Sequence, residues 1–115
     1  MEYYGSNSYW PNSIFGARPV PGSPGKFAGI VAGHHGSHRE GELVLFDVGR
    51  GRREADGAVQ RIPGRGQKIE PIVRDELTAA SWPKFVHPYP LSDKYFLATC
   101  KLDANAPWDI YLVDV

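Results

Sequence analysis

Three histidines and a glutamate lie within residues 33–41, whose sequence is Gly-His-His-Gly-Ser-His-Arg-Glu-Gly. Imidazole nitrogens and carboxylate oxygens bind zinc and similar ions, so His34, His35 and His38, with Glu40, form a candidate donor set. Glycines in this segment give the backbone the freedom to turn two imidazoles inward. However, the His-His-x-x-His spacing matches no closed structural site. Two interpretations stay open: a metal- or ligand-binding loop, and a polar loop whose histidines hydrogen-bond to a neighbouring sheet.

No catalytic constellation accompanies this loop. None of the serines lies in a Gly-x-Ser-x-Gly elbow, and Gly64-Arg-Gly66 precedes no predicted helix, so it is not a phosphate loop. Cys100 is the one cysteine, which excludes an intrachain disulfide and a Cys-x-x-Cys-His haem attachment and favours a buried thiol. His87, in the first strand of the second unit, is interpreted as a satisfied strand-end histidine; as an alternative, it would come near the histidine loop if adjacent blades lay side by side. We predict no catalytic residues and no cofactor, with an enzymatic role for this chain alone as the less favoured alternative.

Charge excludes some partners. The chain has 13 basic and 13 acidic side chains, so long-range attraction of a polyanion is not indicated. Residues 50–74 hold a local excess of basic side chains, without the interleaved aromatics of single-strand binders. These basic residues are Arg50, Arg52, Arg53, Arg61, Arg65, Lys68 and Arg74. We predict a solvated loop and no nucleic-acid partner. No apolar run reaches about 18 residues, so no membrane span is predicted.

An internal repeat is the main signal for the fold. Lys-Phe-Ala-Gly-Ile-Val-Ala, a polar loop and Glu-Leu-Val-Leu-Phe-Asp are followed later by Lys-Tyr-Phe-Leu-Ala-Thr-Cys, a polar loop and Asp-Ile-Tyr-Leu-Val-Asp. Trp10 and Trp82 are 72 residues apart, Lys26 and Lys94 are 68 apart, and Asp47 and Asp114 are 67 apart. Self-similarity at a fixed period is typical of repeat architectures. Equivalent places at strand ends indicate that the two aspartates are turn formers and not a catalytic pair.

Short apolar and β-branched runs predict strands at residues 14–20, 26–32, 42–48, 58–62, 95–100 and 110–115, with the first strand of the second repeat around His87. Gly and Pro supply the turns between them. Only residues 75–80 permit a short helical turn. Four antiparallel strands per repeat are typical of a propeller blade. We predict an all-β fold of antiparallel four-stranded sheets, about two β-propeller blades in one domain. Unit one spans about 10–64, the connector 65–81 and the truncated unit two 82–115.

Two groups of residues resemble known repeats. Ser-Asp-Lys-Tyr-Phe-Leu-Ala at 92–98 and Asp-Ile-Tyr-Leu-Val-Asp at 109–114 resemble the blade repeat of WD-like propellers. Gly-Ile-Val-Ala-Gly-His-His-Gly at 29–36 and His-Pro-Tyr-Pro-Leu-Ser-Asp-Lys-Tyr-Phe at 87–96 resemble the propeller-containing region of hydrazine synthase alpha-subunit-like proteins of planctomycetes and Bacteroidetes. The resemblance implies a propeller fold and an exported or periplasmic location, although residues 1–7 lack a secretory signal. Some such proteins carry c-type haems, but this chain has no haem-attachment motif.

Length adds a further expectation. A propeller needs at least about four blades to close, and 115 residues at repeat offsets of 67–72 supply fewer than two. The second unit ends inside its third strand, which leaves an unpaired edge. We therefore predict a fragment of a larger propeller that forms a homo-oligomer through exposed sheet edges.

Three functions remain open from the sequence. The first is a non-enzymatic scaffold or interaction module. The second is a metal- or small-ligand-binding propeller segment that uses the histidine loop. The third is a piece of a haem-dependent redox enzyme, inactive alone.

Overall fold

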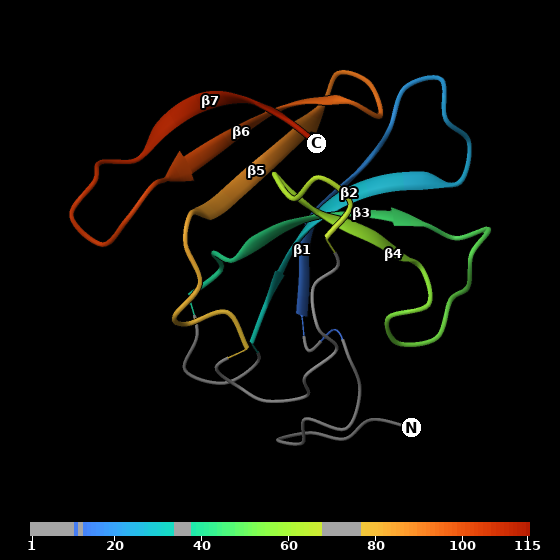
Figure 1. Cartoon of the computed structure of the whole chain (residues 1–115), viewed down its shortest axis with the longest axis horizontal. Helices are drawn as coiled ribbons and strands as arrows, with labels where there is room; N and C mark the ends of the chain where they lie inside the picture. The colour runs from blue at the N-terminus through green and yellow to red at the C-terminus, as the bar shows by residue number, and fades with distance from the viewer. Residues whose placement is uncertain (1–10, 12, 34–37, 68–76) are drawn as a thin grey trace.

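Two antiparallel sheets make up the structure, a computed structural model that describes residues 11, 13–33, 38–67 and 77–115. The described residues form seven strands and no helix. The strands are β1 (Ser13–Pro19), β2 (Lys26–Ala32), β3 (Glu42–Asp47), β4 (Ala58–Ile62), β5 (Lys84–Pro90), β6 (Tyr95–Lys101) and β7 (Asp109–Asp114). Sheet one has the order β1-β2-β3-β4 and sheet two the order β5-β6-β7, each a meander (Figure 1). The all-β prediction is confirmed.

The individual strand predictions hold to within one residue at most ends. The predicted runs 26–32 and 58–62 are β2 and β4, and the run 95–100 is β6 with one residue added. These runs form strands because their β-branched and aromatic side chains fit a pleated surface with alternate sides buried. Of the helix-permissive residues, 77–80 form a turn and 75 and 76 lie outside the described part.

The second and third strands pair in the same register in both sheets. Asp47 pairs with Lys26 in sheet one, and Asp114 pairs with Tyr95 in sheet two. The predicted correspondence of the aspartates is therefore correct, whereas the counterpart of Lys26 is Tyr95 and not Lys94. The two repeats differ in length at the turn between their first two strands, which spans residues 20–25 in sheet one but only 91–94 in sheet two.

A β-bulge occurs at the same place in the first strand of each sheet. The register shifts between Phe15 and Arg18 in β1 and between Val86 and Tyr89 in β5. In both strands the residue after the last regular pair has a positive φ: 59° and 50° for Gly16 and His87. Bulges increase the local twist and redirect side chains.

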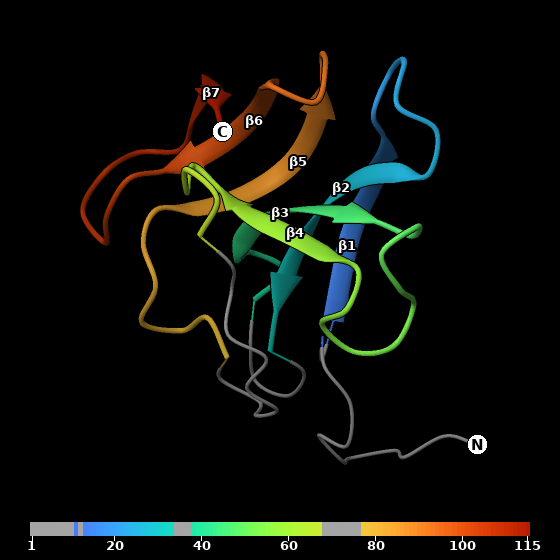
Figure 2. The ribbon, with the colours of Figure 1, turned by 45° about the vertical axis from the view of Figure 1, so that its right-hand side comes forward.

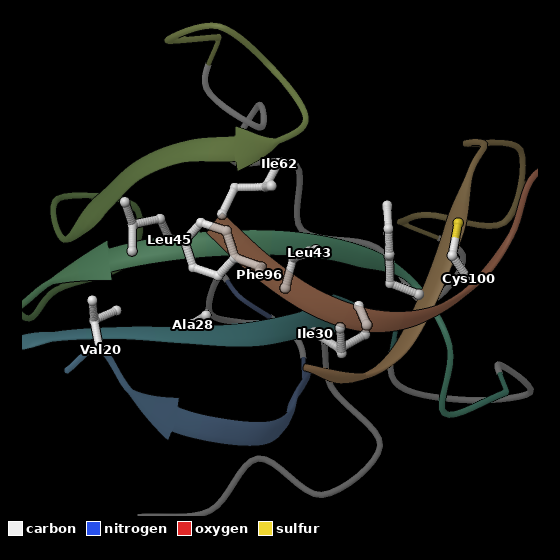
Figure 3. Packing of buried hydrophobic residues seen from close by; sticks show 10 residues of the cluster. Val20, Ala28, Ile30, Leu43, Leu45, Ile62, Phe96 and Cys100 are labelled. Atoms are coloured by element: carbon white, nitrogen blue, oxygen red, sulfur yellow. The ribbon is translucent and has the colours of Figure 1, made fainter. Parts of the chain in front are cut away.

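One face of sheet one packs against sheet two. The shared core contains Val20, Ala28, Ile30, Leu43, Leu45 and Ile62 from sheet one and Phe85, Phe96, Ala98 and Cys100 from sheet two. Figure 3 shows the ring of Phe96 directed toward Leu43 and Leu45 of β3. Because side chains alternate along a strand, the other face of sheet one carries a second cluster. This cluster is Val31, Val44, Phe46 and Ala58, with Phe27, Ala55 and Leu77 packed on it.

β5 is the strand that joins the sheets. It contacts β1, β2 and β3, and Figures 1 and 2 show it beside sheet one with β6 and then β7 farther away. Gly41 and Phe85 exchange two backbone hydrogen bonds, of 3.2 and 2.8 Å. A side chain at Gly41 would overlap the carbonyl oxygen of Val31, so this bridge requires glycine.

A buried lysine fixes the start of β5. The Nζ atom of Lys84 donates hydrogen bonds to the backbone carbonyls of Thr78, at 2.7 Å, and Ala79, at 3.0 Å. Burial lowers the pKa of Lys84, and the carboxylates of Glu40 and Glu42 act in the opposite direction. The carbonyls satisfy the donors that burial removes from water.

Phe96 tests whether the two sheets form one cooperative core. We expect Phe96→Ala to reduce the free energy of unfolding by about 3–5 kcal/mol, because it leaves a cavity between the sheets. Leu102→Ala, at an exposed loop position, is the control and should cost less than about 1 kcal/mol. Urea denaturation followed by circular dichroism measures both. Equal destabilisation by the two substitutions would contradict the packing described above.

Candidate functional site

The predicted metal loop is described only in part. His38 is exposed, whereas His34 and His35 lie outside the described residues. Within residues 11, 13–33, 38–67 and 77–115 no group of three or more His, Cys, Asp and Glu side chains has an arrangement that could hold a metal ion. Metal binding by the three histidines stays a prediction.

A cleft of about 470 Å³ lies between the two sheets where the bulges of β1 and β5 meet. Its lining residues are Phe15, Gly16, Ile30, Arg39, Val86 and His87. Arg39 belongs to the histidine-rich loop and follows His38 directly. The structure therefore places His87 and Arg39 at one cleft, whereas His34 and His35 lie outside the described residues.

Local backbone geometry explains how the cleft forms. Gly16 has φ of 59°, and a Cβ built there would lie 3.1 Å from Cδ of Pro88. The absence of a side chain thus lets the two bulges approach closely. Sequence reasoning did not find the bulges, because a residue that precedes proline normally prefers extended conformations, and His87 precedes Pro88. The Gly in the first strand was the one available signal.

The cleft carries positive charge on an apolar wall. The guanidinium of Arg39 lies 5.7 Å from the centroid of the Phe15 ring, in the geometry of a cation–π contact. No described carboxylate forms an ion pair with Arg39. The His87 side chain is exposed and makes no hydrogen bond to another described residue. An arginine that has no acidic partner among the described residues and lines the same cleft as an imidazole can bind an anion.

A second candidate surface is the outer face of sheet two, the face turned away from sheet one. The register places Tyr89 opposite Leu97, and Leu97 opposite Leu112, in one row across the sheet. Ile110 pairs with Thr99 in the next row. Tyr89, Ile110 and Leu112 are exposed. Together with Leu97 they form an apolar strip of the kind that marks interaction sites.

The outer face corresponds to the face of sheet one that sheet two covers. By register, Leu91, Ile110 and Leu112 are the counterparts of Val20, Leu43 and Leu45. The exposed fractions are 45%, 72% and 64% for Leu91, Ile110 and Leu112, and 4%, 0% and 4% for Val20, Leu43 and Leu45. The same kind of side chain at the same position is thus buried in one sheet and exposed in the other.

The described basic residues of the stretch 50–74 differ in their surroundings. Arg61 lies 3.6 Å from the buried carboxylate of Glu42, whereas Arg50, Arg52, Arg53 and Arg65 are exposed. Lys68 and Arg74 lie outside the described part. Asp47 acts as a turn former, since its Oδ1 accepts a hydrogen bond of 2.8 Å from the backbone N–H of Gly49.

Comparison with protein-family models, with curated proteins and with solved structures finds no match to this chain. The described residues include no helix long and apolar enough to cross a membrane.

Cys100 belongs to the core and not to the cleft. It lies in β6, its side chain is buried, and burial raises the pKa of its thiol. We expect a disulfide reagent to modify native Cys100 at least about 10³-fold more slowly than the unfolded chain, because reaction requires opening of the sheets. The absorbance of the released aromatic thiol measures the two rates. Rapid modification of the native protein would show that sheet two does not cover sheet one as described.

Proposed function

We propose that the chain is a non-enzymatic β-propeller segment that acts as an interaction module, and that a second copy of the chain docks on the outer face of sheet two. The supporting observation is the correspondence between this face and the face of sheet one that is already covered within the chain. Leu43 and Leu45 are buried in a cluster with side chains of sheet two, whereas the equivalent side chains Ile110 and Leu112 are exposed.

The second copy is the preferred occupant because it carries the same apolar strip. A two-fold axis would place Ile110 and Leu112 of each copy against the same residues of the other. Burying an aliphatic side chain contributes about 1.5–3 kcal/mol. Several such side chains from each copy together exceed an association cost of about 4–15 kcal/mol by a modest margin. The small net free energy of association favours a dimer that forms at micromolar rather than nanomolar concentrations.

The edge of sheet two supports the same proposal. In the described part of the chain β7 pairs only with β6, whereas its counterpart β3 also pairs with β4. β4 binds β3 at Leu43, Val44 and Leu45. The equivalent backbone groups of β7 are at 110–112, and they can accept a strand from another chain. Docking on the outer face brings a second copy next to this edge, as expected for a homo-oligomer that uses exposed sheet edges.

Replacement of two apolar side chains of the strip by lysine tests the proposal. We expect the wild-type chain to sediment as a dimer or larger species at micromolar concentrations, and the double variant Ile110→Lys, Leu112→Lys to sediment as a monomer. Both side chains are exposed in the isolated chain, so the free energy of unfolding per chain should change by less than about 1 kcal/mol at concentrations where both are monomeric.

Leu102→Lys is the matched control, because Leu102 is exposed but lies in the loop after β6. It should leave self-association unchanged. A wild-type chain that stays monomeric across the micromolar range, or a double variant that associates like the wild type, would refute docking of a second copy on this face.

A further inference from the structure

We propose that the cleft between β1 and β5 is a binding site for a small organic carboxylate. The site lies between the sheets, away from the outer face of sheet two, so this inference does not depend on self-association. The proposed site uses Arg39 and His87 and none of the predicted metal ligands His34, His35 and His38.

Charge selects an anion. Arg39 lines the cleft, and none of the described carboxylates neutralises it. Its guanidinium is held on the ring of Phe15, which limits the rotamer entropy lost on binding. A planar guanidinium donates two parallel hydrogen bonds to a carboxylate. The imidazole of His87 lines the same cleft and can donate another.

Apolar walls select an organic ligand over an inorganic anion. Phe15, Ile30 and Val86 line the cleft, and Ile30 is buried. The volume of about 470 Å³ lies in the range of small-molecule pockets, roughly 300–1,000 Å³. A carboxylate with an aromatic or branched aliphatic body would place its charge near Arg39 and its apolar part against these side chains.

The bulges give an independent reason to assign a role to His87. Gly16 and His87 are register counterparts, and both have a positive φ. Glycine adopts this conformation without cost, whereas a residue with a Cβ is strained there. The strained residue carries an imidazole that lines the cleft and makes no hydrogen bond within the described structure. Strain of this kind is concentrated at binding and catalytic sites.

Titration with benzoate, followed by the NMR amide shifts of Gly16 and Ile30, tests the proposal. Benzamide has the same shape without the charge and serves as the ligand control. We expect saturable shifts with benzoate and at least about tenfold weaker binding of benzamide, since charge-assisted hydrogen bonds are lost. Inorganic phosphate should bind more weakly than benzoate, because it has no apolar body.

Two variants separate binding from folding. Arg39→Gln should weaken benzoate binding by about tenfold or more, and the control Arg50→Gln, at an exposed position outside the cleft, should leave it unchanged. His87→Gly should weaken benzoate binding severalfold while the unfolding midpoint stays equal or rises, because glycine relieves the positive φ.

The proposal is overturned if benzoate shifts neither amide at millimolar concentration, or if benzamide or phosphate binds as tightly as benzoate. It is also overturned if Arg39→Gln binds benzoate like the wild type. If His87→Gly keeps full affinity, His87 does not take part in binding the carboxylate.

Discussion

Burial of one face of sheet one under sheet two is the interaction on which the rest of this structure depends. A sheet of four strands with apolar side chains on both faces cannot stand alone in water. Sheet two covers one face through Phe85, Phe96 and Cys100, and the turn at 77–80 and Lys84 hold β5 in place for this contact. The cleft exists only because this packing brings the bulges of β1 and β5 together.

Repetition of a single unit creates an asymmetry between the two sheets. Bulge position, strand pairing and the order of the first three strands are the same in both sheets, so corresponding side chains lie on corresponding faces. Among the described residues, sheet two covers one face of sheet one, and no sheet covers the corresponding face of sheet two. Exposure of Ile110 and Leu112 is therefore a consequence of the repeat itself and not of an unusual composition in sheet two.

Much of the fold could be predicted from the sequence, because strands depend on local properties. The short apolar runs at 95–100 and 27–32, with their aromatic and β-branched side chains, are visible without any tertiary information. The register was predictable at Asp47 and Asp114 but not at Lys26, since a turn shorter by two residues shifts the alignment without changing the pattern. The cleft was less accessible, because Phe15, Arg39 and His87 are distant in sequence and meet only through sheet packing.

Gly16 and His87 occupy equivalent bulge positions in β1 and β5, but the two residues have different roles. In β1 the bulge needs a residue without a side chain, since a Cβ would approach Pro88. In β5 the equivalent position faces the open cleft, so a side chain has room there. Histidine tolerates a positive φ better than most residues, but glycine tolerates it better still. Folding alone would therefore favour glycine at both bulges, and the imidazole at the second is best explained by what it can bind.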